Sequence, residues 1–254
     1  MATSLSPVSY IRSIASVFVF LIMFLIGTPI AIVLGILTLG RSSNFVVQYL
    51  GPFMVYPVLF VAGIRLKTIN HGFDFKQPVI YIINHSSTLD LFTMVALGLQ
   101  RIRFVAKWEI QYNPLFFLIG RATGQVFIKR QNREHSINTL QKAYVKLKKN
   151  NLSIMVAPEG SRKHEGIIGP FKKGAFRMAM DLSYPIVPIY FEGSQELSLG
   201  GSLFTNPGTI TAHIHPPIDT SNWKTETIQQ HIADVRGLYL KWANVTEDIV
   251  PRLE

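Results

Sequence analysis

The segment VIYIINHSSTLD, residues Val79–Asp90, carries the clearest structural signal in the chain. Its first five residues indicate a short buried strand, and the apolar spacing of Leu89–Leu99 is typical of a helix. Ser87 stands just before that helix, where its hydroxyl can accept a backbone N–H of the first turn. The segment therefore predicts a buried strand that passes through a short loop into a helix capped by Ser87.

Two side chains of this segment can act together on a proton. Side chains five apart in a regular helix diverge by about 140°, so His85 can reach Asp90 only from outside the helix, on the loop. A neutral imidazole can accept a proton from a hydroxyl, and a carboxylate on its other nitrogen stabilises the imidazolium. Taken singly, Asp90 is better explained as a capping carboxylate and His85 as a strand-end residue, so other segments have to decide.

After Arg65 the chain alternates between strand and helix patterns. Apolar or β-branched runs predict strands at Val79–Ile83, Gln125–Ile128, Ser153–Val156, Ile186–Phe191 and Thr209–Ile214. Helical patterns cover Leu89–Leu99, Pro114–Ile119, Ser136–Lys149, Ala175–Leu182 and Thr225–Ala243. This alternation predicts an α/β fold with a mixed, largely parallel sheet flanked by helices. The intervening segment Gly193–Gly208 has the composition of a surface loop.

Ligands of open α/β sheets collect beyond the carboxyl ends of the strands. Four side chains with suitable chemistry come directly after predicted strands, namely His85, Arg130, Glu159 and Arg162. The order of motifs therefore predicts that a single cleft holds all four.

Four blocks occur in a characteristic order: Asn84–Asp90, Gly124–Arg130, Pro158–Arg162 and Val187–Ile189. Together they resemble the four blocks of the glycerolipid acyltransferase family, closest to its 1-acyl-sn-glycerol-3-phosphate acyltransferases. Further segments similar to the family are Ala106–Glu109, Pro114–Phe117 and Phe171–Phe176. A histidine and an aspartate at this spacing are a weak motif alone, but four ordered blocks are a strong one.

The resemblance implies acyl transfer from an acyl thioester, either acyl-CoA or acyl carrier protein, to the free hydroxyl of a lysophospholipid. The expected acceptor is 1-acyl-sn-glycerol 3-phosphate, and the product is phosphatidic acid. His85 would be the general base, oriented by Asp90, and no acyl-enzyme, cofactor or metal is needed. Glycerol 3-phosphate, a lyso-aminolipid or a second phospholipid in transacylation remain alternative acceptors, and a non-catalytic membrane-binding protein is a remote alternative.

Further roles follow from side-chain chemistry. The planar fork of arginine matches phosphate, so we expect Arg162 and Arg130, with Lys107 as a third cation, to bind the acceptor phosphate. Glu159 is expected to orient an arginine or an acceptor hydroxyl, Gly160 to allow close backbone approach, and Ser161 to supply a hydroxyl. Three positions depart from the family pattern: Ser161 replaces threonine, Lys129 replaces aspartate and Ala157 replaces phenylalanine. These departures leave the acceptor less certain than the reaction.

Several classes of site are excluded or poorly supported by the sequence. Cysteine is absent, which excludes disulfides, thiolate nucleophiles and cysteine-ligated metals. The Gly-x-Ser-x-Gly motif of nucleophile-elbow hydrolases and the His-Glu-x-x-His motif of zinc sites are also absent. His213 and His215 share one face of a predicted strand, and we interpret them as structural or solvent-facing.

The net charge is +10, and the excess is concentrated in one region. Between Arg101 and Arg177 there are 16 Lys and Arg residues against 4 Asp and Glu residues. Such a region can attract nucleic acid, anionic lipid or a phosphorylated substrate, and the family resemblance favours lipid over nucleic acid. Four lysines should form a solvated helix face outside an apolar stripe, namely Lys142, Lys146, Lys148 and Lys149.

The first third of the chain has a different composition. Ser13–Gly40 and Ser42–Ile64 are runs of 28 and 23 residues without a charged side chain. Each could cross a bilayer, which needs about 20 apolar residues. Glycines and prolines interrupt both runs, so the pair either spans the membrane or enters one leaflet. A cleavable signal peptide fits poorly, because the first run is too long and a second follows directly.

We therefore predict a membrane-associated helical pair in residues 1–67 and a catalytic domain in residues 68–254. Related acyltransferases carry a two-helix membrane motif in this position. Three flanking cations, Arg12, Arg65 and Lys67, fall on the side of the catalytic domain. The positive-inside tendency predicts that this side is cytoplasmic.

Overall fold

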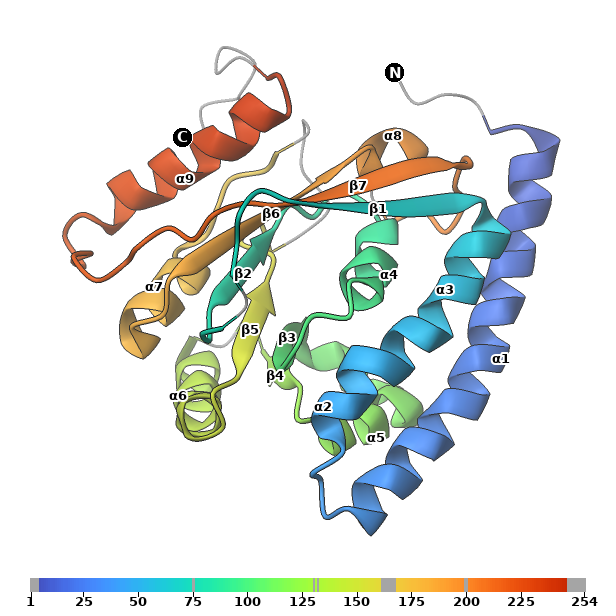
Figure 1. Cartoon of the computed structure of the whole chain (residues 1–254), viewed down its shortest axis with the longest axis horizontal. Coiled ribbons are helices and arrows are strands. Elements are labelled where there is room, and N and C mark those ends of the chain that lie inside the picture. The colour runs from blue at the N-terminus through green and yellow to red at the C-terminus, as the bar shows by residue number, and fades with distance from the viewer. Residues whose placement is uncertain are drawn as a thin grey trace.

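A seven-stranded sheet forms the centre of the computed structural model, which describes residues 5–74, 76–129, 131, 133–160, 168–198 and 201–245 (Figure 1). In chain order the strands are β1 (Ile64–Asn70), β2 (Ile80–Ile83), β3 (Ile102–Lys107), β4 (Val126–Ile128), β5 (Ser153–Val156), β6 (Ile186–Glu192) and β7 (Gly208–Ile214). Their spatial order is β1-β7-β6-β2-β5-β3-β4. The prediction of an α/β fold around a mixed sheet is confirmed.

The sheet divides into two groups of strands with opposite directions. β6, β2, β5, β3 and β4 run parallel to one another, so their carboxyl ends meet at one edge. β7 is antiparallel to β6, and β1 is parallel to β7. Two of the side chains predicted to form a site, His85 and Glu159, follow strands of the larger group and so lie at the same edge of the sheet.

Helices cover both faces of the sheet (Figure 1). They are α4 (Leu89–Ala96), α5 (Pro114–Thr123), α6 (Arg133–Lys149), α7 (Lys173–Leu182), α8 (Ser194–Leu197) and α9 (Ile228–Trp242), with a 3-10 turn, η2, at Trp108–Tyr112. Ile80 and Ile82 pack with residues of α6, α7 and α9, whereas Tyr81 and Ile83 pack with residues of α3 (Gly51–Ala62) and α4. β2 is apolar throughout because alternate side chains enter two different cores.

The N-terminal segment forms two long helical arms. α1 (Pro7–Leu37) runs without interruption through Pro29, and a turn leads into α2 (Ser43–Phe45), a π-helical turn, η1 (Val46–Leu50), and α3 (Gly51–Ala62). Both arms are long and apolar enough to cross a membrane. α3 ends at Gly63, which has a φ of 78°, and β1 follows at once. Whether residues 1–67 form a separate unit stays a prediction.

Three details differ from the sequence-based expectation. β1 and β3 were not predicted, because each carries charged side chains, and β1 is buried mainly at its first residue. α4 is capped at Thr88 rather than Ser87, although the Ser87 hydroxyl does accept the Leu89 N–H. The segment Gly193–Gly208 is not simply a surface loop, since it begins with α8 and includes the fully buried Ser194.

Candidate active site

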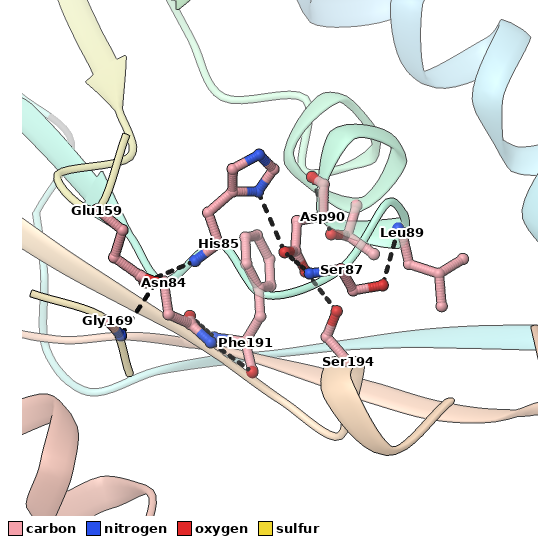
Figure 2. A network of polar contacts seen from close by, with 10 residues as sticks. Asn84, His85, Ser87, Leu89, Asp90, Glu159, Gly169, Phe191 and Ser194 are labelled. Atoms are coloured by element: carbon pink, nitrogen blue, oxygen red, sulfur yellow. Dashed lines mark hydrogen bonds and ion pairs between the residues drawn. The ribbon is translucent and has the colours of Figure 1, made fainter. Parts of the chain in front are cut away.

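The side chains of the site come from the ends of three adjacent strands (Figure 2). His85 follows β2, Glu159 follows β5 and Ser194 follows β6. Asp90 lies in the first turn of α4, the helix entered directly from the His85 loop. The parallel part of the sheet thus brings together residues that are more than 100 positions apart in the chain.

His85 and Asp90 are in contact. His85 Nδ1 lies 3.2 Å from Asp90 Oδ2, and Asp90 is fully buried while the His85 side chain is 15% exposed. The same oxygen accepts the Ser87 N–H at 2.8 Å. Capping of the loop and orientation of the histidine, which the sequence presented as alternatives, are therefore two functions of one carboxylate oxygen.

The second nitrogen of His85 is available for a substrate. Within the part of the chain that the structure describes, no residue bonds Nε2, and Figure 2 shows it turned away from Asp90. If Nδ1 donates its hydrogen to the carboxylate, Nε2 carries the lone pair. The ring is thus oriented to accept a proton at Nε2.

Glu159 holds the backbone on which His85 stands. Its side chain is buried, Oε1 accepts the His85 N–H at 2.9 Å, and Oε2 accepts the Gly169 N–H at 3.2 Å. Gly160 follows with a φ of 70°, and a side chain there would press on Lys172. Both oxygens of Glu159 face the protein, so its expected action on a substrate stays a prediction, and its visible role is to position His85.

Further contacts fix this edge of the sheet. Asn84 accepts the Phe191 N–H at 2.8 Å and donates to the Phe191 carbonyl at 3.1 Å, which ties the β2 loop to β6. The Tyr239 hydroxyl donates to the Ile82 carbonyl at 2.8 Å, and burial raises the pKa of this hydroxyl well above its usual value. Arg236 donates to the Ile168 and Gly169 carbonyls at 3.0 and 2.9 Å.

The predicted phosphate-binding cations are only partly within the described structure. Lys107 ends β3, with its Nζ 3.7 Å from a Glu109 carboxylate oxygen and its side chain 47% exposed. Lys129 follows β4 and lies over the Trp108 ring, 4.8 Å from its centroid. Arg130, Ser161 and Arg162 lie outside the described residues.

A cavity of about 370 Å³ opens between α6, α7 and the sheet. Its apolar lining includes Val105, Ile128, Leu140, Val156 and Met178. Lys172, Lys173 and Arg177 also line it, and so does Gly160 beside Glu159. An apolar cavity lined in part by cations suits a molecule that combines an alkyl chain with an anionic group.

The described residues include no group of three or more His, Cys, Asp or Glu side chains that could hold a metal ion. His213 and His215 lie with His71 in a stack, where His71 Nε2 is 3.0 Å from His213 Nδ1. His215 also stacks on Trp242 with ring centroids 3.6 Å apart. Burial, with His71 and His213 nearby, lowers the pKa of His215 to about 4. His213 lies in β7, and His71 and His215 directly follow β1 and β7, the two strands that run antiparallel to β2.

The sequence analysis did not identify four residues that shape the site. They are Asn84, through its bonds to the Phe191 backbone, and Ser194, Arg236 and Tyr239. Asn84 begins the first family block but had no role of its own assigned there, and the other three lie outside the recognised blocks. Each acts through backbone groups or through another side chain. The one available signal was Gly193-Ser194 at the end of a predicted strand, where a glycine can make a tight turn.

The first N–H groups of a helix have no partner within the helix, so those near Ser87 at the start of α4 are candidates to bind the oxyanion of a tetrahedral intermediate. The Ser87 N–H is bonded to Asp90 and the Leu89 N–H to the Ser87 hydroxyl. Two of the expected donors are therefore already occupied.

Comparison with known proteins gives one consistent result. A family model described as Acyltransferase matches residues 64–192. The 1-acyl-sn-glycerol-3-phosphate acyltransferase of Limnanthes douglasii is 30% identical over 184 residues, which cover 72% of this chain and 65% of the relative. The corresponding protein of Cocos nucifera is 33% identical over 170 residues, 66% of this chain and 55% of the relative. The chain thus spans less than two thirds of the length of these relatives.

A solved structure also resembles this fold. The 1-acyl-sn-glycerophosphate acyltransferase PlsC from Thermotoga maritima superposes with a TM-score of 0.65 at 23% sequence identity. The match covers 92% of this chain and 98% of that one. The likeness extends the similarity of fold beyond the region matched by the family model, to most of the chain.

Proposed function

The chain belongs to the Acyltransferase family, and from that premise we propose that it transfers an acyl group from an acyl thioester to the free hydroxyl of 1-acyl-sn-glycerol 3-phosphate, giving phosphatidic acid. The relatives from Limnanthes douglasii and Cocos nucifera are named for this acceptor. The observation that carries the proposal is the contact between His85 Nδ1 and Asp90 Oδ2 at 3.2 Å, with Nε2 left to face a substrate.

The acyl group passes directly from donor to acceptor, by addition to the thioester carbonyl followed by elimination of the thiolate. His85 Nε2 takes the proton of the acceptor hydroxyl while the hydroxyl oxygen attacks the thioester carbonyl carbon. Asp90 stabilises the imidazolium that forms. The tetrahedral intermediate collapses, the C–S bond breaks, and the thiolate leaves and takes back the proton from the imidazolium. The step needs no acyl-enzyme and no cofactor, and coenzyme A and acyl carrier protein are both suitable donors.

Phosphate recognition is proposed for the flank formed by the ends of β3 and β4. Lys107 and Lys129 lie there. Arg130 comes directly after Lys129 in the sequence and Arg162 comes after β5, the neighbour of β3, so both arginines are proposed to bind the same phosphate. The cavity between α6 and α7 is proposed to take an alkyl chain, since its lining is mainly apolar. Lys129, which departs from the family pattern, bears on the preference among acceptors.

Membrane attachment is proposed to occur through the outer surface of α1. Phe18 and Leu25 are 63% and 61% exposed on this helix. The opposite side of α1 packs on the protein. The Ser9 hydroxyl donates to Asn206 Oδ1 at 2.9 Å, and the Phe24 ring packs at a tilt against Phe116 with centroids 4.6 Å apart. Because α1 is covered on one side at its N-terminal end and near its middle, insertion into one leaflet fits better than an independent span. The catalytic domain is proposed to lie on the cytoplasmic side.

An acyl-transfer assay tests the proposal. Purified protein in mixed micelles is given acyl-CoA or acyl carrier protein with a panel of acceptors: 1-acyl-sn-glycerol 3-phosphate, glycerol 3-phosphate, a lyso-aminolipid and a neutral lysophospholipid. We expect the lysophosphatidate to be acylated fastest, and His85→Ala to abolish the reaction. Transfer at an undiminished rate by His85→Ala, or to none of the acceptors by the unaltered chain, would overturn it.

A further inference from the structure

Ser194 is a buried serine that touches Asp90 from a part of the chain outside the recognised motifs. Its side chain is fully buried, and its hydroxyl donates to Asp90 Oδ1. The other oxygen, Oδ2, accepts the Ser87 N–H and faces His85 Nδ1. Among the described residues, Ser194 is the only donor to Oδ1. The two carboxylate oxygens therefore have separate tasks, one toward the histidine and one toward Ser194.

The fold holds Ser194 in a rigid position. The Asn84 side chain binds both backbone groups of Phe191, which lies three residues before Ser194. Gly193 has a φ of 85°, and a side chain there would lie 2.7 Å from the Thr209 carbonyl oxygen. The turn from β6 into α8 thus requires glycine, and Ser194 approaches Asp90 from a fixed turn.

We propose that Ser194 is a positioning residue for acyl transfer, which keeps Oδ2 of Asp90 turned toward His85 by holding Oδ1. This inference rests on the proposed function of His85 as general base. A carboxylate can rotate about its bond to the chain, and a hydrogen bond at each oxygen prevents that rotation. Without Ser194, Oδ1 would be buried with no donor, and the carboxylate would turn to regain one. The contact with His85 Nδ1 would then weaken.

Three variants separate this role from simple packing. Ser194→Ala removes the donor and leaves a small void. Ser194→Cys leaves no void, because its thiol is slightly larger than the hydroxyl, but it donates only weakly, so it tests the hydrogen bond apart from the void. Ser198→Ala is the matched control, because Ser198 is a buried serine at the end of the same helix whose hydroxyl faces the Ser202 carbonyl and not Asp90.

The kinetic test compares kcat and KM for acyl transfer. Hydrogen bonds to charged groups contribute enough that we expect Ser194→Ala and Ser194→Cys to lower kcat by about 10- to 100-fold. KM for the acceptor should stay within about twofold, because Ser194 does not face the substrate. Ser198→Ala should behave like the unaltered chain. Full recovery of kcat in Ser194→Cys would assign the effect to packing and overturn the proposal.

A spectroscopic test needs no substrate. The proton on His85 Nδ1 should give a far-downfield resonance, assigned by its absence in His85→Ala. We expect Ser194→Ala to broaden or remove this resonance and Ser198→Ala to retain it. If the unaltered chain transferred no acyl group but the resonance depended on Ser194, the proposed function would fail and the positioning role would stand. A resonance and a kcat both unaffected by Ser194→Ala would overturn the positioning role alone.

Discussion

Replacement of Asp90 by asparagine removes the negative charge from the pair His85 and Asp90, here called the dyad, while it keeps the geometry of the pair. Asparagine has the same shape, and its carbonyl oxygen can still accept from Ser87 and His85 while its amide donates to the Ser194 hydroxyl. Removal of a buried charge also relieves a desolvation cost. We therefore expect Asp90→Asn to change the free energy of unfolding by about 1 kcal/mol, a shift in Tm of about 2–4 °C for a chain of this size.

The effect on catalysis should be far larger. A carboxylate oxygen 3.2 Å from the ring nitrogen stabilises a full positive charge by about 5 kcal/mol at an effective dielectric constant of about 20. The imidazolium charge is spread over the ring and only partly developed in the transition state, so about 3–5 kcal/mol should be lost. Each 1.36 kcal/mol is a factor of ten, which predicts that kcat falls by about 10²- to 10⁴-fold.

The measurement is release of the donor thiol, followed with a thiol-reactive chromophore. The chain has no cysteine, so the protein contributes no background signal. Asp234→Asn is the control, since Asp234 is an exposed carboxylate on α9 that bonds Gln230 far along the chain from the site. If Asp90→Asn retained kcat within about tenfold while Asp234→Asn was normal, the electrostatic role assigned to Asp90 would be refuted.

Four further predictions address other parts of the molecule. Glu159→Gln places an amide group against one of the two backbone N–H groups that Glu159 accepts. Thermal unfolding should therefore show that the free energy of unfolding falls by about 1–3 kcal/mol, and kcat should fall with it. An unchanged kcat would contradict the support of His85 by Glu159. Arg162→Ala should lower the turnover of a phosphorylated acceptor more than the use of the donor, as measured with paired acceptors with and without phosphate, and equal losses would argue against phosphate binding. The intact protein should stay with membranes in high salt, whereas Phe18→Lys together with Leu25→Lys on the exposed side of α1 should make the attachment salt-sensitive. Val145→Lys, on the exposed surface of α6, is the control. Release of the unaltered chain by salt would exclude insertion. The folded state lowers the pKa of His215 to about 4, below its ordinary value of about 6.5, so as pH falls the unfolded chain binds a proton at a higher pH than the folded chain does. Stability should therefore be lost as pH falls from about 6.5 to 4. His215→Phe should flatten this part of the curve of Tm against pH, and parallel curves for the two proteins would contradict the assignment.

The five apolar strands and the helices between them were predictable because burial leaves an apolar pattern in the sequence, which is continuous in β2 and β6 and alternates in β7. β2 and β6 are buried along almost their whole length, so their sequences are nearly continuous apolar runs. β1 was missed because strand pairing, rather than burial, stabilises most of its residues, and its charged side chain Arg65 is exposed. β3 was missed because the charged residues Arg103, which is buried, and Lys107, which is exposed, interrupt its apolar pattern.

The chemistry of His85 and Asp90 was also visible in the sequence, because both belong to one short segment at a strand-to-helix junction. Their spacing shows that they can meet if His85 lies outside the helix, and the three other blocks of the sequence favoured the catalytic interpretation. The apolar length of α1 and α3 is likewise a property of composition alone, and it needs no knowledge of the fold.

The supports of the dyad were decided by the tertiary structure. Glu159 and Ser194 lie 74 and 104 positions from the residues that they bond. Their partners are a backbone N–H and a carboxylate oxygen. Neither contact produces a recognisable pattern of residue spacing in the sequence. The sequence by itself determined which groups can react and that they follow parallel strands. The order β6-β2-β5 determined which strand ends are neighbours, because hydrogen bonding between strands brings distant segments to one edge of the sheet.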